Sequence, residues 1–255
     1  MGALLFNVTT AGLMVLMFKA GMALIGEDTV GRRRLPWAAV ALTVVALGAV
    51  VTQLCWSGAM AAFDSDPSKS GWWRIGTSVF LQNGGFLGAA WNIATLAVIA
   101  ALAEWFWGAW LMPALFVAGI LLPQHLDSLI GLADRTSIDP RNFAGSSGAT
   151  YFLAATLAAA LLLRTGRPEA RVHRLLAVSV PALGLVLWFA QSNGHGLVSV
   201  YGFVLGLLAH VLARPILRPD LDLERPARTT MSAVTGLVPV RSRRADQEAG
   251  PRRLR

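Results

Sequence analysis

Two polar side chains with the chemistry of a nucleophile and its base lie at the edges of apolar segments. Ser147 stands in the sequence GSSG, directly before a long apolar run, and His195 stands in SNGHG, at the start of another. A serine hydroxyl attacks a carbonyl when a base lies within hydrogen-bond reach, and histidine is the usual base. The pair is therefore a candidate for acyl transfer. The structural alternatives are a small-residue packing surface around Ser147 and a solvated or capping role for His195.

Other residues in the apolar runs fit the same chemistry or a packing role. Asn92 lies inside an apolar run, where an amide is costly unless it is bonded. It could donate to an oxyanion, or it could bond a neighbouring helix. Two glycines spaced four apart in the run after His195 share one helix face and let a second helix approach, for which the run of Ser147 is a natural partner. The helix-packing candidates are Gly145, Gly148, Gly202 and Gly206.

The elements that position these residues are membrane helices. The chain is 55% hydrophobic and 14% charged, whereas an average soluble domain carries about 25% charged residues. The apolar runs are continuous and lack the alternation of strands, and helices satisfy every backbone polar group within lipid. We expect an all-α, polytopic transmembrane bundle. Its seven runs are 4–25, 36–56, 79–103, 109–123, 145–163, 175–190 and 196–213.

The basic residues predict the orientation of the bundle. Residues 32–34, 164–174 and 214–255 hold 3, 4 and 10 of the 22 basic residues, and all three segments lie on one side of the membrane if the runs from 36 onward are spans. Loops rich in arginine stay cytoplasmic. We therefore expect a cytoplasmic C-terminus in a bacterial plasma membrane, with Ser147 and His195 near the outer face. The same placement explains the basic pI by contact with the lipid bilayer, without nucleic acid as a partner.

The sequence divides the chain into three regions. Residues 1–35 form an N-terminal helix and a basic loop; the helix is an extra span or an interfacial helix whose Lys19 snorkels to the headgroups. It lacks the basic start and the cleavage site of a secretory signal peptide. Residues 36–213 form a six-span core. Residues 214–255, rich in Pro, Arg and Asp, are expected to be disordered.

Composition argues against several other classes of protein. The single cysteine, Cys55, excludes an internal disulfide and argues against a thiolate metal site. We expect neither a metal nor a cofactor. A transporter is disfavoured because we detect no inverted repeat and because no Asp or Glu lies within the well-defined spans, Glu104 being at a boundary.

Taken together, residues 36–213 resemble the rhomboid family of intramembrane serine proteases. The features that carry the resemblance are six spans with both ends cytoplasmic, Trp73-Arg74 in a long first outer loop, Asn92 in the next span, the Gly-x-Ser-Gly motif and the glycine pair of the last span. The resemblance implies a serine–histidine dyad without a carboxylate. Ser147 would be the nucleophile, a last-span histidine the base and Asn92 one oxyanion donor. The substrates would be transmembrane proteins.

Two positions depart from the family pattern. The family base usually stands three residues before the first glycine of the last-span pair, where this chain has Ser199; His195 lies one turn earlier, about 6 Å along a helix. The family also has a histidine four residues before the asparagine, where this chain has Gly88. Two functions stay open. One is an active protease that uses His195, with Ser199 as the alternative position of the base. The other is a catalytically inactive rhomboid-like protein that binds or chaperones transmembrane segments.

Overall fold

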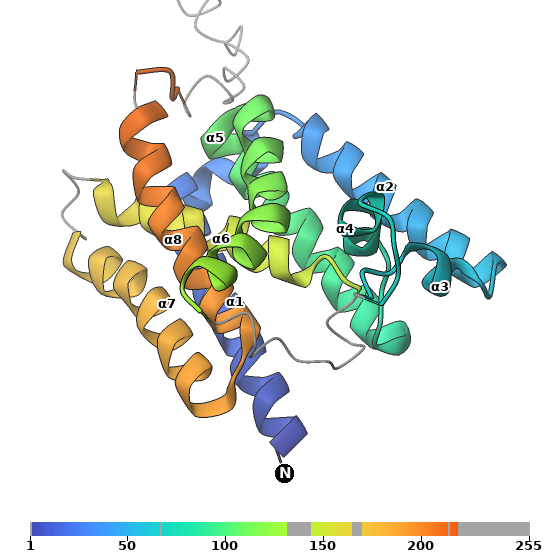
Figure 1. The fold of residues 1–255 in the computed structure, drawn as a ribbon. Helices are drawn as coiled ribbons and strands as arrows, with labels where there is room; N and C mark the ends of the chain where they lie inside the picture. The colour runs from blue at the N-terminus through green and yellow to red at the C-terminus, as the bar shows by residue number, and fades with distance from the viewer. Residues whose placement is uncertain (1, 67, 132–143, 165–169, 214, 219–255) are drawn as a thin grey trace, which may run out of the picture. The chain divides into compact units, whose positions relative to one another are not determined.

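The chain folds as an all-α bundle of membrane helices, as the sequence predicts. The computed structural model describes residues 2–66, 68–131, 144–164, 170–213 and 215–218, and the regular elements in these ranges are helices (Figure 1). Within them, five helices are long and apolar enough to cross a membrane. The elements are α1 (Gly2–Ile25), η1 (Glu27–Arg32), α2 (Trp37–Cys55), α3 (Ala59–Phe63), α4 (Trp73–Thr77), η2 (Ser78–Phe80), α5 (Gly85–Leu129), α6 (Ser147–Leu163), α7 (Ala170–Gln191) and α8 (Gly194–Ala213).

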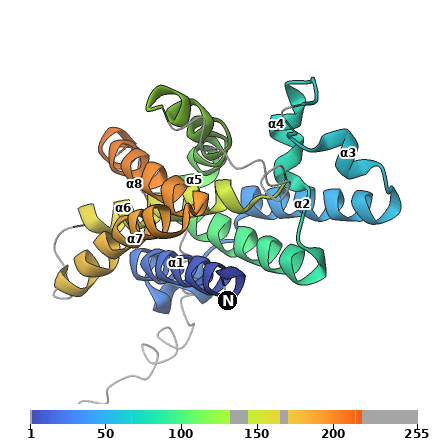
Figure 2. The same cartoon turned by 60° about the horizontal axis from the view of Figure 1, so that its bottom comes forward.

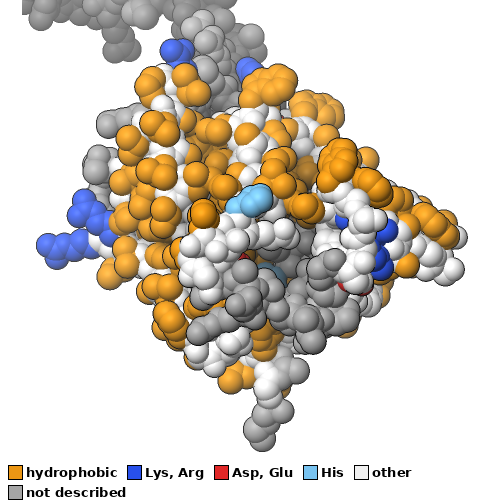
Figure 3. All heavy atoms as spheres, viewed as in Figure 1, with side chains coloured by type: hydrophobic (Ala, Val, Ile, Leu, Met, Phe, Trp, Pro, Cys, Tyr) orange, Lys and Arg blue, Asp and Glu red, His pale blue; other side chains and the backbone are white. Residues whose placement is uncertain are grey.

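The surface of the described helices suits a lipid environment. Hydrophobic side chains cover much of the face shown in Figure 3, and lysine and arginine side chains lie toward its margins. Large apolar residues such as Val44 on α2, Phe189 on α7 and Leu208 on α8 are exposed. Contiguous exposed apolar surface of this extent is typical of membrane contact. The chain is therefore a membrane protein.

The long helix α5 contains two spans. Its 45 residues would extend about 68 Å, more than twice the hydrocarbon thickness of about 30 Å. The helix is interrupted at Gly108, whose φ of 83° and ψ of 165° are not helical. A positive φ favours glycine because it lacks a Cβ. The sequence predicted a span over 79–103, whereas helix α5 begins at Gly85 because Gly84 and Gly85 both have positive φ and residues 78–80 form η2.

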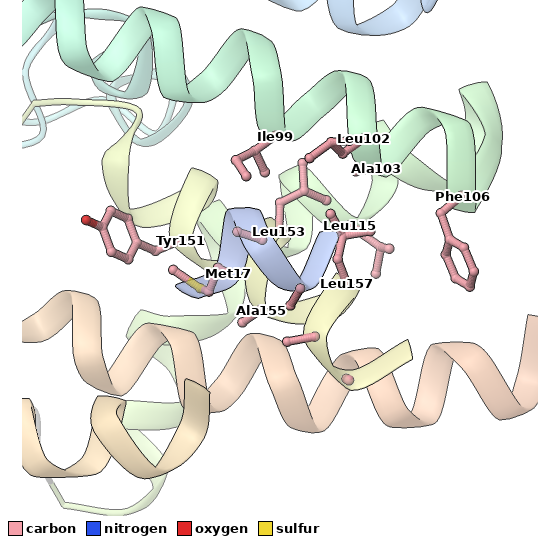
Figure 4. Close-up of a cluster of buried hydrophobic side chains, with 14 of the residues drawn as sticks. Met17, Ile99, Leu102, Ala103, Phe106, Leu115, Tyr151, Leu153, Ala155 and Leu157 are labelled. Atoms are coloured by element: carbon pink, nitrogen blue, oxygen red, sulfur yellow. The ribbon is translucent and has the colours of Figure 1, made fainter. Parts of the chain in front are cut away.

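Helix α6 is the central element of the bundle. It packs against α1, α5, α7 and α8, and every residue from Ala149 to Leu161 is buried. A helix that is apolar on all sides is expected to be buried in this way. Figure 4 shows Leu153, Ala155 and Leu157 of α6 among side chains from the surrounding helices. The position of Ser147 at the start of α6 is therefore set by contacts on all sides.

Helix α6 is short for a membrane span. Its 17 residues extend about 25 Å, less than the hydrocarbon thickness of about 30 Å. At its far end the Arg164 guanidinium donates a hydrogen bond to the carbonyl of Leu24, near the start of the basic segment. A helix of this length with Arg164 at one membrane boundary would end a few ångströms short of the opposite boundary. We call the end of the bundle at Ser147 the serine face, and the end at Arg33 and Arg164 the arginine face.

Helix α1 has the length and packing of an additional span. It runs alongside α6, with α7 on one side and the first half of α5 on the other (Figure 2). Leu13, Met17, Ala20 and Leu24, on one helix stripe, are buried, whereas Lys19 is exposed. This packing supports the spanning alternative over an interfacial helix. The predicted disorder of residues 214–255 concerns a segment of which the structure describes only 215–218.

Candidate active site

Ser147 is held by a glycine turn at the start of α6. The Gly145 N–H donates to the carbonyl of Ser78 at 3.0 Å, and Gly145 has a φ of 135°, which favours glycine. A side chain at residue 145 would lie 3.7 Å from Ser147 Oγ. Gly145 therefore acts through its backbone conformation and leaves room beside the hydroxyl, in contrast to the helix-packing role expected for it.

The structure brings His195 into contact with Ser147. His195 Nε2 lies 2.9 Å from Ser147 Oγ, although the residues are 48 positions apart. Helix α8 begins at Gly194, so His195 lies in its first turn, at the depth where α6 also begins. The ring of Tyr151, one turn along α6, packs edge-on against the imidazole with centroids 4.7 Å apart. The serine and the histidine thus meet at the starts of two adjacent helices.

Ser199 does not occupy the position of a base. It is fully buried, and its hydroxyl donates to the carbonyl of Gly196 at 2.7 Å, within α8. A side chain at Gly184 of α7 would lie 2.7 Å from Ser199 Oγ, so this hydroxyl faces α7. The Ser199 hydroxyl is therefore turned toward α7, whereas His195 contacts Ser147.

Asn92 lies near the serine, within a chain of amides. A side chain at Gly145 would lie 3.9 Å from Asn92 Nδ2, beside the space next to Ser147 Oγ. Asn92 Nδ2 donates to Gln82 Oε1 at 2.8 Å. Gln53 of α2 in turn binds the Gln82 backbone twice: its Nε2 donates to the Gln82 carbonyl at 3.1 Å, and its Oε1 accepts from the Gln82 N–H at 2.8 Å. This amide chain fixes the orientation of Asn92.

Gln82 has a second amide hydrogen-bonding group next to the site. The residue is 8% exposed, and its Nε2 is buried without a hydrogen-bond partner among the described residues. A buried donor left unpaired costs about 1–3 kcal/mol, so such groups call for a functional explanation. Because Gln82 Oε1 already binds Asn92, its Nε2 is an additional donor close to Asn92.

A small pocket opens near the start of α6, where Gly145 and Gly148 line it. It has a volume of about 110 Å³, and the residues around it come from the segment after α2, the second half of α5 and the start of α6. Gly148 lines it, and no atom lies within 4 Å of the position that a Gly148 side chain would take. Gly148 was expected to pack against a helix, but it faces this open space. Ser78 and Gln124 give the pocket polar groups suited to water or a small substrate group.

The other two glycines face the serine helix. A side chain at Gly202 would overlap the carbonyl of Phe152, and one at Gly206 would lie 2.6 Å from Thr156 Cα. The backbones of α6 and α8 thus approach closely, as glycines spaced four apart allow. This approach sets the separation of the two helices that carry Ser147 and His195.

The assembled groups are suited to acyl transfer. His195 can accept the hydroxyl proton of Ser147, while Asn92 Nδ2 and the free N–H groups at the start of α6 can donate to a developing oxyanion. Among the described residues, no three His, Cys, Asp or Glu side chains gather in a group that could hold a metal ion.

Sequence reasoning missed several residues that shape this site. Tyr151 stands four residues after Ser147, a spacing that places both on one helix face and could have identified it. Gln53 and Gln82 lie 29 residues apart, and nothing in their local sequence indicates that they meet.

The chain matches no family model, no curated protein and no solved structure with which it was compared. The resemblance to rhomboid proteases therefore depends on the motifs and on the geometry of the site.

Proposed function

We propose that this protein is an intramembrane serine endopeptidase of the rhomboid type, with Ser147 as nucleophile and His195 as general base. The observation that carries the proposal is the 2.9 Å contact between His195 Nε2 and Ser147 Oγ. A hydrogen bond of this length is what proton transfer from the hydroxyl to the imidazole requires. The placement of Asn92 beside the same space supports the proposal.

The reaction proceeds through an acyl-enzyme. Ser147 Oγ attacks the substrate carbonyl carbon as its proton passes to His195 Nε2. Asn92 Nδ2 and the N–H groups at the start of α6 stabilise the oxyanion. The imidazolium then protonates the leaving amine, and the C–N bond breaks. A water molecule, deprotonated by His195, attacks the acyl ester; the imidazolium returns that proton to Ser147 Oγ, and the substrate acid is released. Side chains, backbone N–H groups and a water molecule supply every group, so this reaction needs no cofactor.

The depth of the site supports a membrane-embedded substrate. Because α6 is shorter than the hydrocarbon layer, we expect Ser147 to lie slightly below the boundary at the serine face. The arginines of the arginine face support a cytoplasmic location for that end. The scissile bond then lies in the outer part of the lipid bilayer, and we propose single-span transmembrane proteins of a bacterial plasma membrane as the substrates.

One observation favours a second function, in which the protein binds or chaperones transmembrane segments without cleaving them. Gly88 stands where the family has a second histidine, and nothing lies within 4 Å of the position that its side chain would take. Loss of one oxyanion donor costs about 100- to 1000-fold in rate. A site weakened in this way would retain the fold and the membrane partners while losing turnover.

Substitution of Ser147 separates the two functions. The purified protein is reconstituted in liposomes with a single-span reporter, and cleavage is followed for Ser147→Ala, His195→Ala and Ser199→Ala. We expect the first two to lose at least about 1000-fold in rate, and Ser199→Ala to retain cleavage. Ser146→Ala is the matched control, because the Ser146 hydroxyl is buried and makes no hydrogen bond among the described residues.

Two results would decide against proteolysis. Cleavage that survives Ser147→Ala would exclude Ser147 as the nucleophile. Three results together would establish the binding function instead: no cleavage, no fluorophosphonate labelling at Ser147, and reporter binding that does not change in Ser147→Ala.

A further inference from the structure

Through one residue, helix α1 accepts hydrogen bonds from the two side chains that lie next to His195. Thr10 Oγ1 accepts a hydrogen bond from Asn193 Nδ2 at 2.7 Å. The carbonyl of the same residue accepts a hydrogen bond from the Tyr151 hydroxyl, also at 2.7 Å. Asn193 precedes His195 by two residues, and the Tyr151 ring packs against the imidazole. A residue of the N-terminal helix thus contacts the neighbours of the base from two directions.

The hydroxyl of Thr10 determines how the Asn193 amide is turned. Thr10 Oγ1 donates its proton to the carbonyl of Phe6 at 2.6 Å. A hydroxyl has only one proton to donate, so toward Asn193 it acts as an acceptor. The Asn193 NH2 group must therefore face Thr10, and the Asn193 Oδ1 faces away from it.

The Asn193 oxygen in turn fixes the start of α8. Asn193 Oδ1 accepts the backbone N–H of His195 at 3.0 Å, as an N-cap side chain does. The Gly196 N–H donates to the Asn193 carbonyl at 2.9 Å, which closes the first turn. Asn193 is fully buried, so water does not replace these partners. The backbone position of His195 therefore depends on the contact with Thr10.

Helix α1 is itself held in place along its length. At the arginine face, Arg33 donates to the carbonyl of Ile25 at 2.9 Å, and Arg164 donates to that of Leu24. Near the same end, a side chain at Gly21 would lie 3.1 Å from Leu102 and 3.2 Å from Leu157, so α1 contacts both α5 and α6 closely. Because its other end is anchored, Thr10 has a defined height relative to Ser147.

We propose that Thr10 is a positioning residue for His195, and that α1 is a required part of the active site. The inference rests on the proposed function. Thr10 acts through Asn193, which caps the helix that carries the base. A displacement of about 1 Å between nucleophile and base is enough to lower the rate about 100-fold. Loss of the Thr10 hydroxyl is expected to produce a displacement of this order.

The test compares five variants of the full chain in liposomes. Thr10→Val keeps the shape of the side chain but removes the hydroxyl, and we expect kcat to fall about 10- to 100-fold with KM within about twofold. Thr10→Ser restores the hydroxyl and is expected to recover most of the rate. Asn193→Ala should resemble Thr10→Val, and adding Thr10→Val to it should lower the rate little further, because both remove the same contact. Thr52→Val is the matched control, since among the described residues the Thr52 hydroxyl bonds only Gly48 of its own helix.

A measurement independent of turnover accompanies these rates. The imidazole ¹⁵N signals of His195, assigned with a His195→Ala variant, should shift and broaden in Thr10→Val and stay unchanged in Thr52→Val. If Ser147→Ala still cleaves, the proposed protease fails, and this measurement alone decides whether Thr10 positions His195.

Several outcomes would overturn the inference. They are unchanged His195 signals in Thr10→Val, a wild-type or higher kcat for Thr10→Val, failure of Thr10→Ser to recover the rate, and fully additive losses in the double variant. A higher kcat would mean that α1 obstructs the site instead of supporting it.

Discussion

A methyl group added at Gly206 tests whether the close approach of α6 and α8 positions the site. In Gly206→Ala the new methyl group would lie 2.6 Å from Thr156 Cα and 2.9 Å from Ala159 Cβ. Carbon atoms in favourable contact are about 3.5–4.0 Å apart. The two backbones must therefore separate by about 1 Å, since the nearest atom belongs to the α6 backbone.

The separation should affect both stability and rate. Overpacking of this kind costs about 1–3 kcal/mol of unfolding free energy, which exceeds the gain of about 1 kcal/mol from replacing a helical glycine by alanine. Ser147 and His195 lie at the starts of the two helices that move apart, so a displacement of about 1 Å should also lower the cleavage rate about 100-fold.

The assay uses a matched glycine. Gly48 lies in α2, is exposed, and has no atom within 4 Å of the position that its side chain would take. Gly48→Ala should therefore keep the wild-type rate and unfold at the same or higher denaturant concentration. The reasoning is refuted if Gly206→Ala behaves like Gly48→Ala in both reporter cleavage and reversible unfolding in mixed micelles.

Two further predictions concern the amide chain and the arginine face. Gln82→Ala removes the acceptor that orients Asn92, so kcat in the liposome assay should fall about 10- to 1000-fold; a wild-type kcat would exclude an oxyanion role for this chain. Glu104 is buried, and its Oε2 accepts the Ala39 N–H at 2.7 Å near the start of α2. Glu104→Ala should therefore lower the unfolding free energy by about 1–3 kcal/mol, whereas the cleavage rate of the folded fraction should stay unchanged; an unaltered unfolding midpoint would contradict this.

The membrane helices follow from the sequence because lipid permits few alternatives. A segment that leaves water must satisfy its own backbone groups, so long apolar runs predict helices directly. The boundary at the start of α5 was less predictable. Residues 79–84 read as part of an apolar run, but the positive φ angles of Gly84 and Gly85 start the helix later. Such angles depend on the contacts of the loop as well as on the presence of glycine.

The residue types of the candidate site were also readable from sequence. Ser147, His195 and Asn92 stand out because each is a polar group at or within an apolar segment, where it must be bonded or functional. Their roles in catalysis stay predictions. The spacing of residues in the sequence could not decide whether His195 or Ser199 lies next to Ser147. That depends on where α8 begins and on which neighbouring helix each face of α8 contacts.

The sequence by itself determined that this is a bundle of membrane helices and which polar residues enter it, since both follow from the cost of placing backbone and polar groups in lipid. Only the tertiary structure decided that His195 meets Ser147, that Ser199 faces α7, and that Thr10 contacts Asn193. Those contacts join residues as far as 183 positions apart. They depend on helix depth, rotation and cap geometry, which no local pattern of residues specifies.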